Sequence, residues 1–184
     1  MTKKDLKELI REDKEYYFGK STKHIARFLT HNPLYRRGKY IITCRKLGYH
    51  NSRNGMVYKV LALYYQHKKN ILGEKLHIEF GSNEFGRRLR IYHNDIIVNA
   101  GAVIGDNCEF YGNNCVGNKG SKFESLAAPV IGNNVSFGVG ANAIGKITIC
   151  NNVQISSMSL ENKSITEEGL YGGIPAKLIR GEEN

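Results

Sequence analysis

The sequence contains no long hydrophobic stretch and no disulfide motif. None of its 184 residues lies in a run approaching the ~20 apolar residues that a membrane-spanning helix requires. The first residues, MTKKDLKELIREDKEYYFGK, are too highly charged for the apolar core of a signal peptide. The four cysteines have no CxxC spacing, so we interpret Cys44, Cys108, Cys115 and Cys150 as reduced thiols. We therefore expect a cytoplasmic protein.

Acidic residues are scarce in the first part of the chain. Residues 1–75 hold 18 Lys and Arg against 6 Asp and Glu, whereas residues 76–184 hold 9 against 11. The basic surface of residues 1–75 would attract anionic partners, although a solvated helical face explains it equally well. We expect no nucleic-acid partner because no binding motif accompanies the charge. Peripheral contact with an anionic membrane, at its inner face, is a hypothesis.

Residues 1–75 are predicted to form a small, mostly helical segment. Apolar residues at helical spacing indicate a helix over Lys3–Tyr17 and another over about Asn54–Lys69. A further helix is expected from about Ser21, as N-cap, to Leu29. We expect Asn32-Pro33 to end that helix, because the residue before proline avoids the helical region.

From about residue 77 a six-residue period appears. Each unit begins with a large apolar residue, its fifth position is often small or aliphatic, and Gly or Asn is frequent between them. The units begin at Phe85, Ile91, Val98, Ile104, Phe110, Val116, Ile131, Phe137, Ala143, Ile149 and Ile155. Three units close one triangular coil, and eleven make almost four coils, which exceeds the minimum for a continuous core. We therefore predict a mainly β fold, a parallel β-helix over residues 76–165 followed by a C-terminal tail over 166–184.

The period is interrupted twice. Seven residues rather than six separate Ile91 from Val98, so one residue is inserted just after His93. Fifteen residues separate Val116 from Ile131, so residues 118–130 should leave the coil as a loop. Because solenoids place functional insertions on one face, both interruptions indicate a site.

At this point the sequence resembles the hexapeptide-repeat acyltransferases, in particular the serine acetyltransferase-like group. The matching segments are IYHNDIIVNAGAVIGDN, GNNCVGNKG, PVIGNNVSFGVGANAIGKITI and YGGIPAKLI, within about residues 77–180. The resemblance implies a left-handed parallel β-helix, a homotrimer, and acetyl-CoA bound between adjacent β-helices as co-substrate, with no metal.

The resemblance also implies site residues. His93 matches the catalytic histidine, whose imidazole would take a proton from an attacking hydroxyl. A carboxylate would orient it: Glu79 after a one-residue slip, with Glu84 and Asp95 as rivals. Tyr92 and Asp95 would face the acceptor.

Coenzyme A contacts are expected on residues spread along the repeat and the tail. Backbone N–H groups at Gly117-Asn118, which correspond to the family's glycine pair, would stabilise the oxyanion. Val139 and Ser157 would contact the pantetheine arm, and Lys177 or Arg180 would contact the phosphates.

The acceptor remains open between several classes. Serine acetyltransferases carry an acidic residue where Tyr92 stands and an Arg-His pair where Ala127-Ala128 stands, so charge matching for free serine is missing. The segment NPLYRR at residues 32–37 looks like relatives associated with surface-polysaccharide assembly. We therefore place acetylation of a sugar hydroxyl first and serine O-acetylation second. An amino-sugar N-acetyltransferase and a non-enzymatic β-helix scaffold follow.

Overall fold

The computed structural model describes residues 1–19, 22–81, 85–120 and 127–181. The chain divides into two compact units, Met1–Ile78 and Glu79–Asn184, which correspond to a helical unit and a β-helix. None of the described helices is long and apolar enough to cross a membrane.

The helical unit contains four helices, α1 (Lys3–Tyr17), α2 (Thr22–Leu29), α3 (Pro33–Asn51) and α4 (Met56–Leu76). Helix α1 begins with a capping box in which Thr2 and Asp5 bond each other's backbone. The expected N-cap of α2, Ser21, lies outside the described residues. Helix α3 supplies most of the core, with Tyr40, Ile41 and Cys44 almost fully buried.

Helix α3 was not predicted from the sequence, because Asn32-Pro33 serves two purposes. Asn32 caps α3 by accepting a hydrogen bond from the Leu34 backbone N–H at 2.9 Å, and Pro33 takes the first helical position. Proline is favoured there because its fixed φ suits the helix and no N–H bond is lost. Asn32-Pro33 therefore follows the end of α2 and also begins α3.

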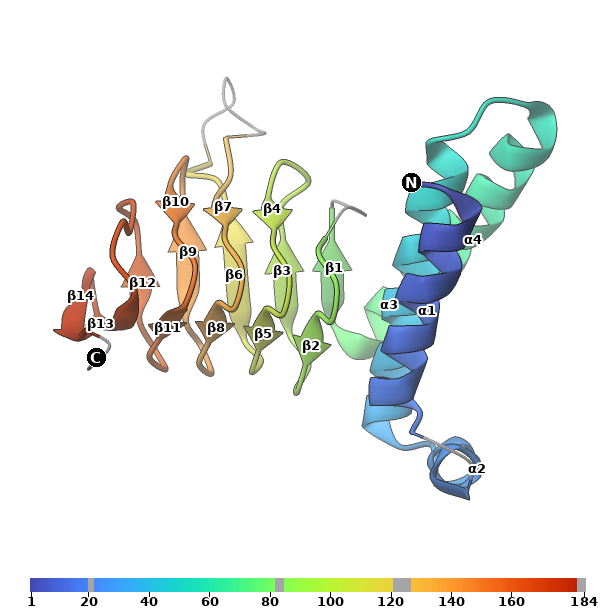
Figure 1. Cartoon of the computed structure of the whole chain (residues 1–184), viewed down its shortest axis with the longest axis horizontal. Coiled ribbons are helices and arrows are strands. Elements are labelled where there is room, and N and C mark those ends of the chain that lie inside the picture. Colours follow the sequence, from blue (N-terminus) through green and yellow to red (C-terminus); the bar gives the residue numbers. More distant parts are fainter. Residues whose placement is uncertain (20–21, 82–84, 121–126, 182–184) are drawn as a thin grey trace. The chain divides into compact units, whose positions relative to one another are not determined.

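The second unit is a parallel β-helix of about five coils, and the fold class expected from the hexads is confirmed. Figure 1 shows its strands succeeding one another along one axis. Three sheets form its faces. The first sheet contains β1 (Ile78–Phe80), β3 (Ile96–Val98), β6 (Asn114–Gly117), β9 (Asn142–Ile144) and β12 (Leu160–Glu161). The second sheet contains β4 (Val103–Ile104), β7 (Val130–Ile131) and β10 (Thr148–Ile149). The third sheet contains β2 (Arg90–Ile91), β5 (Glu109–Phe110), β8 (Ser136–Phe137), β11 (Val153–Ile155), β13 (Gly169–Gly173) and the antiparallel β14 (Ala176–Arg180).

Each position of the hexad has a distinct structural role. The apolar first residues from Ile91 onward point inward and are buried, whereas Phe85 is only half-buried. The residue before the fifth position adopts positive φ at many corners, for example Asn107, Asn134 and Asn152. Asparagine tolerates that conformation better than other non-glycine residues, which explains its frequency in the repeat.

The β-helix contains one more coil than the eleven hexads predicted. Strand β13, within the range expected to form a tail, pairs in parallel with β11 and continues the third sheet. The preceding inward position is Glu161, which is 2% exposed, so the aliphatic pattern is broken there. Burial raises the pKa of this carboxyl, and its Oε1 accepts a hydrogen bond from the Lys163 backbone at 2.9 Å.

The predicted loop falls between β6 and β7. Residues 118–120 and 127–129 lie outside strands, and residues 121–126 are not among those described. Val130 and Ile131 nevertheless pair in register with Val103 and Ile104 of the preceding coil. The excursion therefore leaves the stacking of the coils intact.

Candidate functional site

His93 lies at an exposed corner of the first coil, between β2 and β3. Strand β2 ends with the buried Ile91, and β3 begins with the buried Ile96, so the intervening residues must turn from one face to the next. Asp95 completes this turn with a φ of 63°. The imidazole is thus carried on a short corner fixed at both ends by inward-facing side chains.

Three later coils place residues on the same corner as His93. The hydrogen bond from Gly140 N to Gly112 O (2.9 Å) and that from Met158 N to Val139 O (2.8 Å) set the stacking. The corner line, as we call it, consists of His93, Gly112, Val139 and Ser157. At ~4.8 Å per coil it extends about 14 Å along the β-helix. Val139 and Ser157 are both exposed, so two of the expected cofactor contacts share a corner with His93.

The other expected contacts lie elsewhere on the β-helix. Gly117 ends β6, one face away from the corner line, and its carbonyl accepts a hydrogen bond from Gly145 N at 2.8 Å. Asn118 follows it and accepts a hydrogen bond from Gly120 N at 3.0 Å. Lys177 is exposed on β14 opposite Gly172, and the alternative Arg180 is exposed on the same strand.

Two of the three carboxylates expected to orient His93, Glu79 and Asp95, lie among the described residues. Glu79 occupies the outward middle position of β1, between buried Ile78 and Phe80. Asp95 is exposed, and its carbonyl accepts a hydrogen bond from Asn114 N at 3.1 Å. In the described part of the chain, neither carboxylate forms a hydrogen bond or ion pair with His93. The third candidate, Glu84, lies outside the described residues.

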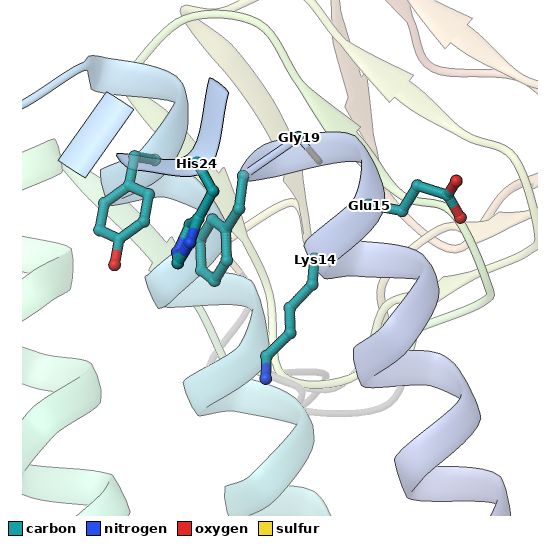
Figure 2. A pocket seen from close by; sticks show the side chains of 6 residues that line it. Lys14, Glu15, Gly19 and His24 are labelled. Atoms are coloured by element: carbon teal, nitrogen blue, oxygen red, sulfur yellow. The ribbon is translucent and has the colours of Figure 1, made fainter. Parts of the chain in front are cut away.

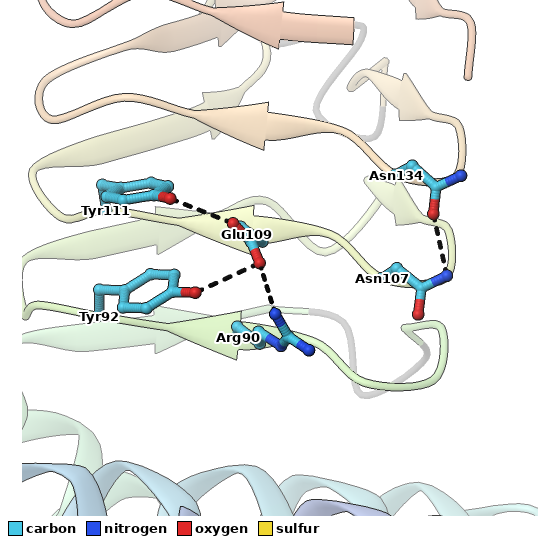
Figure 3. A network of polar contacts seen from close by, with 6 residues as sticks. All are labelled: Arg90, Tyr92, Asn107, Glu109, Tyr111 and Asn134. Carbon is cyan, nitrogen blue, oxygen red and sulfur yellow. Dashed lines mark hydrogen bonds and ion pairs between the residues drawn. The ribbon is translucent and has the colours of Figure 1, made fainter. Parts of the chain in front are cut away.

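Tyr92 belongs to a polar cluster that the sequence analysis did not predict. The Glu109 carboxylate accepts hydrogen bonds from Arg90 Nη1 (2.9 Å), Tyr92 Oη (3.2 Å) and Tyr111 Oη (3.2 Å), as Figure 3 shows. The two tyrosine rings stack with centroids 4.6 Å apart. We call these four residues the Glu109 cluster. Arg90 and Glu109 are 19 residues apart in the sequence, as are Tyr92 and Tyr111, because one coil of 18 residues is lengthened by the inserted residue. Aligning the hexads of successive coils would have brought these pairs together.

Burial and neighbouring charge shift the pKa of two residues in the cluster. Burial, together with the negative charge of Glu109, raises the pKa of Tyr111, so this phenol keeps its proton. Burial opposes the charged form of Arg90, but bonds to Tyr92 and Glu109 outweigh it and raise the pKa of the guanidinium.

The cysteines are free thiols in the structure. Burial raises the pKa of Cys44 to about 12 and that of Cys108 to about 11. Since the thiolate is the reactive form, neither is suited to nucleophilic chemistry near neutral pH.

A cavity of about 390 Å³ lies in the helical unit. It is lined by Lys14, Glu15, Phe18, Gly19, His24 and Tyr35. Figure 2 shows the aromatic rings gathered on one side and Glu15 directed away from them. Phe18 packs on Tyr35 with ring centroids 4.4 Å apart and on His24 at 5.5 Å. None of the site residues predicted from the sequence lines this cavity.

Comparisons with known proteins fit the architecture of the β-helix. No family model matches the chain. Two relatives are serine acetyltransferases, one from Staphylococcus xylosus (34% identity over 98 residues, 53% of this chain and 45% of the relative) and one from Synechococcus elongatus (31% over 84 residues, 46% and 34%). The chain spans about half the length, or less, of the curated relatives it matches.

Crystal structures give the same fold at lower sequence identity. Serine acetyltransferase from Brucella abortus superposes with a TM-score of 0.75 and 19% identity, covering 99% of this chain and 71% of that one. Its complex with coenzyme A gives 0.76 at the same identity, with 99% and 70% covered. The Neisseria gonorrhoeae enzyme gives 0.72 at 19% identity, with 100% and 69% covered. These likenesses establish the fold.

Proposed function

We propose that this protein is an acetyl-CoA-dependent O-acetyltransferase with His93 as general base and serine as the first acceptor to consider. The observation that carries the proposal is the corner line, in which an exposed histidine shares one corner with Val139 and Ser157. The sequence similarity to serine acetyltransferases and a structural counterpart in complex with coenzyme A support it.

The proposed chemistry needs one proton carrier. The acceptor hydroxyl loses its proton to the imidazole of His93 while its oxygen attacks the thioester carbon. The C–S bond then breaks, and the imidazolium returns the proton to the departing sulfur. A positioned base of this kind contributes ~10²–10⁴-fold. No covalent acyl-enzyme forms, which is consistent with buried, unreactive thiols at Cys44 and Cys108.

The residues available for acetyl-CoA suit an extended thioester ligand. Along the corner line, Val139 and Ser157 offer exposed backbone and small side chains to a pantetheine arm. Lys177 and Arg180 are exposed cations for its phosphates. The pair Gly117-Asn118, one face away, stays our candidate for the oxyanion contact, and Glu79 remains a candidate to orient His93.

Serine takes precedence over a sugar as acceptor because the relatives named above are serine acetyltransferases and none is described as acting on a polysaccharide. The sugar acceptor expected from the sequence has no support among them. The charge mismatch at Tyr92 persists, since its hydroxyl bonds Glu109. Asp95, exposed on the same corner, is the nearest carboxylate in sequence for an acceptor's ammonium.

The test is thiol release from acetyl-CoA, followed with serine and separately with a panel of sugars and amino sugars. His93→Ala should reduce release to background with every acceptor. His67→Ala is the matched control, because His67 is also exposed but belongs to the helical unit. Release by the His93 variant at the wild-type rate would refute the proposal. Thiol release with a sugar but not with serine would identify a sugar as the acceptor.

A homotrimer with acetyl-CoA in the groove between subunits is part of this proposal. Val103 and Val130 are about half exposed and adjacent on the second face, which gives neighbouring β-helices an apolar surface to cover. Light scattering coupled to gel filtration should give a mass three times the 20.7 kDa of the chain. A monomer that retains full activity would contradict the shared groove.

Peripheral contact with an anionic membrane also remains a proposal. Helix α2 has no buried residue and exposes Ile25, Phe28 and Leu29, while α4 exposes a stripe of apolar side chains. Cations outnumber acids threefold in residues 1–75, which favours anionic lipid. Sedimentation with phosphatidylglycerol vesicles should carry the protein down at low salt, and phosphatidylcholine vesicles should not. Equal binding to both, or to neither, would contradict it.

A further inference from the structure

The corner that carries His93 contains an irregularity of register. Tyr92 N bonds Phe110 O at 2.9 Å, and Asn113 N bonds Asn94 O at 3.1 Å. Two residues, His93 and Asn94, therefore stand opposite the single residue Gly112. This is the two-against-one arrangement of a β-bulge, which changes the direction of the side chain it carries. The inserted residue seen in the sequence thus has a defined structural effect at His93.

Gly112 provides the space that this bulge requires. Its φ is +112°, and a β-carbon built there would lie 2.6 Å from the His93 β-carbon and 3.1 Å from the Asn94 carbonyl oxygen. Carbon atoms in contact prefer separations of about 3.5–4.0 Å, so a side chain at Gly112 would displace His93. The buried Asn114 holds this glycine by accepting a hydrogen bond from its N–H at 2.8 Å.

The residues that precede His93 and Gly112 are also joined. Tyr92 stacks on Tyr111, and the Glu109 carboxylate accepts a hydrogen bond from each hydroxyl. The Glu109 cluster therefore restrains the chain one residue before His93, while Gly112 limits it at His93 itself. Figure 3 shows both tyrosines directed toward the same carboxylate.

We propose that Glu109, Tyr111 and Gly112 are positioning residues that fix the imidazole of His93. The inference rests on the proposed function for its catalytic consequence, but its structural part does not. A general base must be held close to its working geometry, and displacement by ~1 Å can cost about 10²-fold in rate. These residues act on the reaction through His93.

The decisive variants are Gly112→Ala and Tyr111→Phe. Gly55→Ala is the matched control for the first, because Gly55 also has a positive φ (118°) and belongs to the helical unit. Tyr171→Phe is the control for the second, because its hydroxyl donates to the Glu167 carbonyl at 2.9 Å in the last coil. Each control carries the same chemical change, and neither residue belongs to the two coils that carry His93 and Gly112.

The first readout is the His93 imidazole signal in NMR spectra of the protein without substrates. Gly112→Ala and Tyr111→Phe should shift or broaden this signal, whereas the two controls should leave it unchanged. The second is steady-state kinetics. Gly112→Ala should lower kcat about 100-fold, Tyr111→Phe about 3–10-fold, and both should leave the KM for acetyl-CoA within about twofold.

An unchanged His93 signal in both variants, or kcat values equal to those of the controls, would overturn the inference. Tyr111→Phe keeps the ring stack, so it tests the inference even if Gly112→Ala does not fold. Absence of acetyl transfer by the wild-type protein would instead defeat the proposed function. In that case the NMR comparison would still decide whether these residues position His93.

Discussion

The two phenylalanines at the centre of the β-helix offer a quantitative test of how one coil supports the next. Phe110 and Phe137 have no exposed surface, and their rings lie 5.0 Å apart between centroids at an interplanar angle of 6°. Buried aromatic pairs are worth about 0.5–1.5 kcal/mol beyond the area they bury. We expect a double-mutant cycle of Phe110→Leu and Phe137→Leu to yield a coupling in that range.

Leucine is chosen so that the fold survives. Each single change should cost about 1–3 kcal/mol, and both together leave part of a typical 5–15 kcal/mol of stability. Urea unfolding should be followed by far-UV circular dichroism and by tyrosine fluorescence. The two transitions must coincide, because solenoids do not always unfold in one step.

Phe110→Leu combined with Ile41→Val is the matched control. Ile41 is equally buried but belongs to the helical unit, so the two effects should add within about 0.5 kcal/mol. A coupling between Phe110 and Phe137 no larger than in this control would refute the reasoning. Because Phe110 stands between Glu109 and Tyr111, its replacement should also lower kcat more than replacement of Phe137.

Three further changes test other parts of the structure. Burial raises the pKa of Glu161, so its charged form destabilises the folded state as pH rises through the folded-state pKa. Glu161→Gln should therefore raise the melting temperature at pH 8. The difference between variant and wild type should vanish below about pH 4, where the carboxyl is protonated in the unfolded state as well. The buried guanidinium of Arg45, which is 3% exposed, lies 2.8 Å from the Asp13 carboxylate. Asp13→Ala removes this ion-pair partner and should lower the free energy of unfolding in urea by about 3–5 kcal/mol. A loss below about 1 kcal/mol would contradict this expectation. Deleting Asn94 restores the six-residue period, so the melting temperature should not fall while kcat drops ~100-fold or more; retained activity would show that the bulge does not matter.

The β-helix could be predicted because its information is local. One inward apolar residue in every six, such as Ile104 or Ile131, is enough to set the period, and the coil geometry then follows. The fifth coil could not be predicted, since Glu161 replaces the inward aliphatic residue and only the structure shows that it is buried. The third helix was missed because proline favours both the end of one helix and the start of another.

The candidate site divides in the same way. The inserted residue beside His93 is visible as a count in the sequence, and it corresponds to the bulge opposite Gly112. The Glu109 cluster joins side chains 17–19 residues apart, which requires the register between coils to be known. The sequence did not decide among Glu79, Glu84 and Asp95 as the carboxylate expected to orient His93, and the structure leaves both Glu79 and Asp95 exposed.

The regularity of the solenoid favours a functional role for the bulge opposite Gly112. In a stacked coil each corner is constrained by the next, so an extra residue that stays within the corner needs space in the neighbouring coil. Here that neighbour is Gly112, and the residue pushed outward is His93. Asn113 and Asn114 restore the regular register immediately afterwards by bonding Asn94 and Asp95. The distortion is therefore confined to the point where a general base would have to leave the repeat to reach a hydroxyl.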